Sequence, residues 1–156
     1  MSVAFLKERD GEDAPVDELP DRPVSSHPNF VTADGFAAIE LALARHQADW
    51  TQAHAAGDRT ALARLGREVR YWTQRRATAQ VAPPPEDPGR VSFGSAVEVV
   101  RADGRRQSWR IVGEDEADPA HGALSYVSPL AQALLGRDAG ETVDFGGSAI
   151  EILKVS

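Results

Sequence analysis

The acid-rich stretch after residue 112 holds the densest group of potential metal ligands in the sequence. Asp115, Glu116 and Asp118 lie close together within residues 113–122, a segment bounded by glycines. Carboxylates at this spacing could bind a divalent cation, but a calcium loop requires a twelve-residue pattern with a central glycine and a closing glutamate. That pattern is absent, so we interpret the segment as a solvated loop and expect no metal site.

Other residue types that could carry chemistry are sparse. The chain has no Cys, which excludes a disulfide framework, a thiolate zinc site and a cysteine nucleophile. His46 lies among core-forming residues without a second ligand beside it, and His121 is interpreted as a lone surface histidine. There is neither a nucleophile elbow nor a phosphate-binding glycine loop. We therefore expect a protein that is not itself an enzyme.

Arginine is concentrated between residues 59 and 76, where Glu68 is the single acid. Such a run is either a solvated helix face or a positive strip that meets an acidic protein groove or nucleic acid, and both readings stay open. The candidate residues of this basic strip are Arg59, Arg64, Arg67 and Arg70.

Composition limits the class of protein. The chain has 156 residues, 42% of them hydrophobic, and a net charge of -7, which fits one ordinary domain or a small domain with an arm. The negative charge opposes direct binding to nucleic acid or to an anionic membrane. No apolar run approaches the ~20 residues of a membrane span, and the start of the chain has no apolar signal core. We expect a cytoplasmic protein.

The middle of the chain predicts two antiparallel helices. Thr32 is a suitable N-cap for a helix over residues 33–56, Gly57 a suitable C-cap, and Asp58 the N-cap of a second helix. Apolar residues recur at steps of three and four in both helices, as in a coiled coil. The predicted seam residues are Phe36, Ile39, Leu43, His46, Trp50, Ala53, Leu62, Leu65, Val69, Trp72, Arg76 and Ala79.

The C-terminal part predicts an antiparallel sheet with one helix. Asp103-Gly104 marks a hairpin turn, and Ser128-Pro129 is a strong helix start. The expected strands are 96–101, 105–112, 124–127, 142–145 and 149–155, and the expected helix is 130–135. The whole chain then divides into an acidic, Pro-rich leader (1–29), a two-helix arm (30–82), a Pro-rich linker (83–90) and an α+β unit (91–156). We expect the leader to be extended and mostly unpacked.

Several stretches resemble the Gre-type bacterial transcript cleavage factors. The run Leu-Ser-Tyr-Val-Ser-Pro-Leu-Ala-Gln-Ala-Leu-Leu-Gly at 124–136 is similar to that family's C-terminal domain, as are residues 111–118 and 151–155. Gly-Asp-Arg-Thr at 57–60 resembles the tip of its coiled-coil arm. The resemblance covers almost the whole chain.

The resemblance implies a coiled-coil arm joined to an FKBP-like domain, with bacterial RNA polymerase as partner. The domain would grip the rim of the polymerase secondary channel through Val127, Ser128 and Pro129, and the arm would enter the channel. In the family, two acids at the arm tip help to hold a second magnesium ion for RNA cleavage. Contact with nucleic acid would be indirect, and we expect a monomer that binds no membrane.

This sequence departs from the family pattern at the tip. Asp58 matches the first tip acid, but Ala61 stands where the second acid is expected, and the Glu-Asn pair that follows in the family is absent. Each helix is also shorter by about eight to ten residues, which at ~1.5 Å per residue removes about 12–15 Å of reach. We therefore favour an N-cap role for Asp58.

Three hypotheses follow. The first is a Gre-family regulator that binds polymerase at the secondary channel and modulates initiation or elongation without efficient cleavage. The second is a true cleavage-stimulating elongation factor, in which Asp58 would share the polymerase magnesium. The third is an adaptor that uses the coiled coil and the FKBP-like unit to bind another protein. We expect no cofactor of the chain's own.

Overall fold

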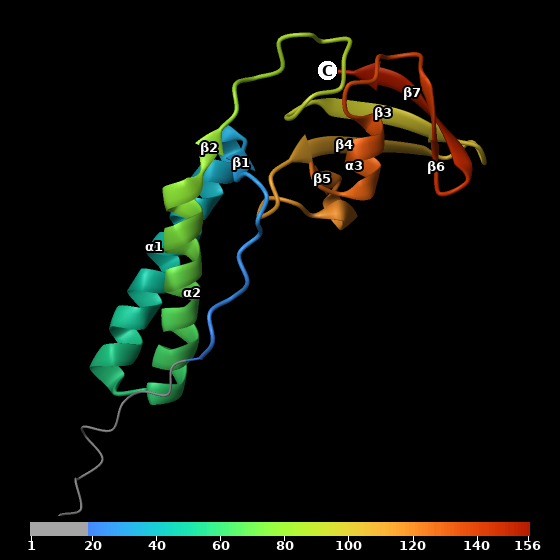
Figure 1. The fold of residues 1–156 in the computed structure, drawn as a ribbon. Helices are drawn as coiled ribbons and strands as arrows, with labels where there is room; N and C mark the ends of the chain where they lie inside the picture. Colours follow the sequence, from blue (N-terminus) through green and yellow to red (C-terminus); the bar gives the residue numbers. More distant parts are fainter. Residues whose placement is uncertain (1–18) are drawn as a thin grey trace, which may run out of the picture.

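The computed structural model describes residues 19–156; the first part of the predicted leader, residues 1–18, lies outside the described residues. In Figure 1, two helices lie side by side as an arm that projects from a globular unit. The elements are β1 (Phe30–Val31), α1 (Ala33–Ala56), α2 (Arg59–Thr78), β2 (Gln80–Val81), β3 (Ala96–Arg101), β4 (Arg106–Val112), η1 (Pro119–His121), β5 (Ala123–Ser125), α3 (Pro129–Leu134), β6 (Thr142–Phe145) and β7 (Ser148–Val155). The predicted α+β fold class is confirmed.

Helix α1 spans the predicted residues and α2 begins where the sequence predicts, although α2 ends at Thr78, before the predicted seam residue Ala79. Thr32 caps α1, because its Oγ1 accepts a hydrogen bond from the Gly35 amide at 2.9 Å. Gly57 ends α1 with φ of 66°, a left-handed conformation that favours a residue without Cβ. Asp58 then caps α2 by accepting a hydrogen bond from the Ala61 amide at 3.0 Å. At ~1.5 Å per residue, α1 is about 36 Å long.

The seam between α1 and α2 is narrower than the sequence predicts. Ile39, Leu43 and Leu65 are buried in it. Trp50 is 39% exposed, so its predicted place in the core is wrong. Arg76 is also exposed and bridges the helices at the surface, 3.2 Å from Glu40. A pair of helices without a third layer cannot enclose side chains as large as Trp.

A short parallel pair of strands closes the base of the arm. Phe30 of β1 lies opposite Gln80 of β2, and Val31 opposite Val81. The Gln80 amide donates to the Asn29 carbonyl at 2.8 Å. The sequence did not predict this pair, which joins the chain segment before α1 to the one after α2.

The sheet of the globular unit has the strand order β5-β4-β3-β7-β6. The hairpins β3–β4 and β6–β7 are antiparallel, as predicted. The prediction of an entirely antiparallel sheet is wrong for β5, which pairs in parallel with β4. The connection 113–122, which includes η1, returns the chain so that β5 runs in the same direction as β4.

One face of this sheet packs against α3 (Figure 1). Leu134 of α3 and Ile111, Ile150 and Ile152 of the strands are completely buried. Together with the surrounding valines and leucines they form one hydrophobic core.

The described part of the leader is extended but not unpacked. Residues 19–22, which we call the strap, run beside α2 toward the end of the arm that carries Gly57 (Figure 1). Arg22 lies over the Tyr71 ring at 3.7 Å and pairs with Glu68 at 2.8 Å. The expectation of an unpacked leader is therefore wrong for these residues, because α2 offers both an aromatic face and a carboxylate to Arg22.

Within residues 19–156, none of the helices has the length and apolar character needed to cross a membrane.

Candidate functional site

The tip of the arm carries one carboxylate. Asp58 is exposed, and its Oδ1 accepts the hydrogen bond from the Ala61 amide that starts α2. Between residues 50 and 67 the sequence contains no other acid. Asp58 therefore occupies the position of a helix cap, with Ala61 and not a second carboxylate one turn away.

This tip offers fewer ligands than the two-acid magnesium site that the family resemblance implies. Mg²⁺ takes an octahedral set of oxygen ligands and is usually held by one or two carboxylates together with a substrate phosphate. Asp58 offers a single carboxylate with one oxygen already hydrogen-bonded. Among residues 19–156, no group of three His, Asp or Glu side chains could hold a metal ion.

The predicted basic strip runs along α2 but is not uniform. Arg59 and Arg64 are exposed near the tip. Arg70 pairs with Asp21 of the strap at 2.6 Å and donates to the Leu19 carbonyl at 3.1 Å. Arg67 is half-buried, and its Nε is enclosed without a hydrogen-bond partner among the described residues. The strap thus already covers part of the strip.

The predicted rim-binding residues lie at the start of α3. Ser128 caps this helix by accepting a hydrogen bond from the Ala131 amide at 3.3 Å. Pro129 follows at the first helical position and is exposed, while Val127 is half-buried. The helix-initiating role of Ser128 and Pro129 is thereby confirmed. Their part in binding a partner stays a prediction.

The arm is fixed to the globular unit by an ion pair that the sequence analysis missed. Arg75 of α2 is 2% exposed, and its Nε donates to Asp115 Oδ2 at 2.5 Å. The same guanidinium donates to Asn29 Oδ1 at 2.7 Å, and Asn29 returns a bond to the Arg75 carbonyl at 2.8 Å. Tyr71 also donates to Asp115. We call this group the joint.

A second connection joins the start of α1 to the same acidic segment. Thr32 donates to Glu116 Oε2 at 2.6 Å while its oxygen accepts from Gly35. A Cβ on Gly35 would stand 2.5 Å from that carboxylate oxygen. Glycine at residue 35 therefore permits the close approach of Glu116 to the cap of α1.

Backbone and aromatic contacts complete the joint. The rings of Phe30, Phe93 and Tyr126 pack against one another with centroids 5.6–6.2 Å apart. A Cβ on Gly113 would stand 2.3 Å from the Phe30 carbonyl oxygen, so the two backbones meet there almost without a gap. Tyr126 donates to the Pro28 carbonyl. The start of α3 thus lies next to the base of the arm.

Burial and charge at the joint favour the neutral form of its phenols. Burial, followed by the hydrogen bond to Asp115, raises the pKa of Tyr71 to about 12. Burial and the nearby Glu114 carboxylate raise the pKa of Tyr126. Glu114 also lies 3.9 Å from Arg75, which is too far for a hydrogen bond but close enough to balance its charge.

These contacts correct two predictions from the sequence. The segment 113–122 is not simply a solvated loop, because Asp115 and Glu116 bind the arm. Arg75 belongs to the buried joint and not to an exposed arginine face. Asp118 does remain at the surface, paired with an exposed His121 at 2.7 Å. His46 is half-buried on the seam, 3.9 Å from Glu68.

Comparison with known proteins identifies the globular unit. Residues 85–156 match the family described as "Transcription elongation factor, GreA/GreB, C-term". Over 97 residues the chain is 39% identical to transcription elongation factor GreB of Neisseria meningitidis, covering 58% of this chain and 60% of that protein. It is 44% identical over 70 residues to GreA of Rhodopseudomonas palustris, covering 42% and 44%. The chain thus spans about 60% or less of these relatives.

The similar solved structures are more distant in sequence. GreA factor homolog 1 of Thermus thermophilus has 18% identity and a TM-score of 0.39, with 83% of this chain and 99% of that chain covered. GreA/GreB of Nitrosomonas europaea has 19% identity and a TM-score of 0.41, with 81% and 98% covered. The domain match and the relatives in sequence show that residues 85–156 are similar to the C-terminal domain of the GreA/GreB elongation factors.

Proposed function

We propose that this protein binds bacterial RNA polymerase at the rim of the secondary channel, in the cytoplasm, and modulates transcription by occupying the channel without efficient transcript cleavage. Its similarity to elongation factors supports the kind of partner. The observation that carries the lack of cleavage is the tip, where a single carboxylate caps a helix and Ala61 replaces a second acid.

The globular unit would provide the affinity for polymerase, and the arm would occupy the secondary channel. Val127 and Pro129 lie at the start of α3, where Pro129 is exposed and its backbone is held in place by the Ser128 cap. The joint would set the direction in which the arm leaves this unit, since Arg75 and Asp115 connect α2 to the segment that follows β4. An arm fixed in this way enters a channel without first having to be ordered, which lowers the cost of binding.

A competition experiment tests this proposal. A backtracked polymerase complex is incubated with a cleavage-competent GreB and increasing amounts of this protein, and the shortened RNA is measured. We expect dose-dependent inhibition of the GreB-stimulated cleavage, because both proteins would need the same channel. Pro129→Asn should weaken the inhibition, whereas Asp58→Asn, which keeps a helix cap, should leave it unchanged.

Two results would contradict the proposal. Cleavage by GreB that is unaffected by a large excess of this protein, together with failure to co-purify with core polymerase, would favour the adaptor hypothesis. RNA shortening by this protein without GreB would favour the true cleavage factor.

A further inference from the structure

A hollow lies at the boundary between the base of the arm and the globular unit. It has a volume of about 400 Å³, and its walls come from the start of α1, the end of β2, the Pro-rich linker, the segment before β3 and the strand β4. Its lining residues include Val81, Pro83, Pro84, Pro85, Phe93 and Arg110. Pockets that bind ligands typically have volumes of ~300–1,000 Å³, so this hollow can accommodate side chains of a partner.

The apolar wall of the hollow is formed by groups that are already held in place. The ring of Phe93 packs against those of Phe30 and Tyr126, with centroids 6.2 and 5.6 Å away. The prolines at 83–85 have a fixed φ and no amide N–H, so they present apolar rings. A Cβ on Gly94 would lie 3.6 Å from Pro85 Cδ, which places the linker directly against the globular unit. Because the wall is preformed, a partner that covers it has little to order.

Arg110 is the one charged side chain among the described residues that line this hollow. It is exposed, and no carboxylate of residues 19–156 forms an ion pair with it. The other arginines of the globular unit have partners, which are carboxylates for Arg90, Arg105, Arg106 and Arg137 and the Gln107 side chain for Arg101. A guanidinium without such a partner can bind a carboxylate in a bidentate manner.

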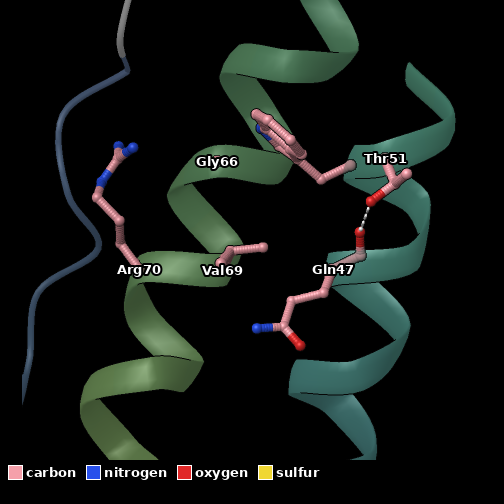
Figure 2. Close-up of a pocket in the computed structure, with 6 residues that line it drawn as sticks. Gln47, Thr51, Gly66, Val69 and Arg70 are labelled. Carbon is pink, nitrogen blue, oxygen red and sulfur yellow. Dashed lines mark hydrogen bonds between the residues drawn. The ribbon is translucent and has the colours of Figure 1, made fainter. Parts of the chain in front are cut away.

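Two other hollows of the described chain differ in their charge. The groove on the arm, shown in Figure 2, has a volume of about 530 Å³, and its arginine, Arg70, turns toward the N-terminal segment and pairs with Asp21 at 2.6 Å. A hollow of about 360 Å³ on the linker is lined by Glu86 and Asp87, and its one arginine is paired within the globular unit. Of the three, the hollow at Arg110 therefore favours an acidic group most strongly.

The strand β2 adds free main-chain groups at the edge of this hollow. The amides of Gln80 and Ala82 donate to the carbonyls of Asn29 and Val31 at 2.8 and 2.9 Å. Because successive residues of a strand direct these groups to opposite sides, the N–H and C=O of Val81 point away from β1. Within residues 19–156 no strand pairs with β2 on that side, and Val81 is 51% exposed. An extended peptide can pair with both groups, as in strand addition.

We propose that this hollow is a docking site for an extended segment of a partner protein, in which an apolar residue is followed by an acidic one. The main chain of the segment pairs with Val81, its apolar side chain packs against Phe93 and the linker prolines, and its carboxylate binds Arg110. The free strand edge favours a peptide over a nucleic acid, which has no alternating N–H and C=O groups. The site goes beyond the proposed function, because it includes neither the predicted rim residues nor the tip of the arm.

A peptide titration followed by NMR tests this site on the full chain. The probe is the acetylated and amidated pentapeptide Val-Thr-Phe-Asp-Val, added up to millimolar concentration to the ¹⁵N-labelled protein. We expect saturable shifts of the amide signals of Val81, Phe93 and Arg110, and none for Gly104 and Gly146 in the hairpin turns of the sheet. The same peptide with Asn in place of Asp should bind about tenfold more weakly.

Two variants of the protein test the individual contacts. Arg110→Gln should weaken binding about tenfold, whereas Arg106→Gln, which removes an arginine paired with Glu98 on the neighbouring strand, should leave it unchanged. Val81→Pro removes the outward N–H and should weaken binding about fivefold. Because this proline can disturb β2, the exposed Arg110 provides the decisive comparison.

Three results would overturn the proposal. The first is the lack of saturable shifts at Val81 and Arg110. The second is binding that is equally tight for the Asn peptide or for the Arg110→Gln protein, since the carboxylate would then not be recognised. The third is tighter binding of a single-stranded oligouridylate at the same signals, which would identify a nucleic-acid site.

Discussion

The two ends of the arm differ in what their carboxylates contact. At the tip, Asp58 is exposed and, among the described residues, bonds to the start of its own helix. At the base, Asp115 and Glu116 bond across the boundary between the arm and the globular unit. The base of the arm therefore has carboxylates that connect it to the globular unit, whereas the tip has one carboxylate where a cleavage factor would need metal ligands.

This contrast separates two requirements of a protein that acts through an arm. Fixing the direction of the arm relative to the globular unit requires buried, hydrogen-bonded groups. The cluster of Arg75, Asn29 and Asp115 meets that requirement. A magnesium site uses one or two carboxylates that remain free to coordinate the ion. The base has the first arrangement, and the tip lacks the second.

The largest effect is expected from breaking the ion pair of the joint. Arg75→Met leaves Asp115 without its guanidinium partner, and losing one partner of a buried pair costs about 3–5 kcal/mol. Urea unfolding followed by circular dichroism measures the loss. Adding Asp115→Leu should recover part of it, because the charge of Asp115 is then removed together with that of Arg75.

A surface pair provides the matched control. Arg106 and Glu98 are 3.3 Å apart, with the arginine side chain 72% exposed. Arg106→Met should cost about 0–1 kcal/mol, as exposed pairs do. Equal losses of stability for Arg75→Met and Arg106→Met would contradict the description of the joint as a buried ion pair.

A smaller loss of stability is expected when the backbones at Gly113 and Phe30 are forced apart. Gly113→Ala places a Cβ 2.3 Å from the Phe30 carbonyl oxygen, and overpacking of this kind typically costs about 1–3 kcal/mol. The control is Gly66→Ala on α2, where the nearest atom is 3.4 Å away and the helix should gain up to about 1 kcal/mol. Urea unfolding of both variants measures the two changes in stability. Destabilisation by Gly66→Ala alone would contradict the close approach of the Gly113 and Phe30 backbones.

At the tip, the expected loss is that of a helix cap. Asp58→Ala should destabilise the arm by about 1 kcal/mol, whereas Asp58→Asn should be nearly neutral because Asn caps equally well. Thermal unfolding of the two variants gives the comparison. Equal and large losses for both would show that the Asp58 carboxylate does more than cap α2.

The smallest effect is a pH dependence in the alkaline range. The folded pKa of Tyr71, about 12, lies above the ordinary phenol value of 10.0, so its contribution to stability is complete below pH 10 and is lost as the pH rises toward 12. Absorbance titration should show this late phenol, and Tyr71→Phe should remove it. Titration of Tyr71 at an ordinary phenol pKa would contradict its bond to Asp115.

The sequence predicts the parts of this molecule that depend on local signals. Thr32, Gly57 and Asp58 mark the helix ends correctly because capping depends on residues only a few positions apart. The hairpin turn at Asp103-Gly104 and the start of α3 at Ser128-Pro129 follow for the same reason. Such short-range signals are sufficient to predict the order of the main helices and strands along the chain.

The joint could not be predicted in the same way. Arg75 and Asp115 are 40 positions apart, and their contact depends on how the arm leaves the sheet. Read locally, Arg75 is one arginine of a basic run and Asp115 one acid of a glycine-bounded loop. One signal could have suggested a contact, because Arg75 and Asp115 both lie outside the apolar pattern. That signal does not indicate which residue each of them contacts.

The most direct test of the account is RNA cleavage by this protein alone. A backtracked polymerase complex is incubated with a saturating amount of the protein, and transcript length is followed over time beside a GreB control. We predict no shortening beyond that of polymerase without a factor, while the protein remains bound to the complex. Shortening as fast as with GreB, abolished by Asp58→Asn, would contradict the claim that the tip carboxylate serves only as a helix cap.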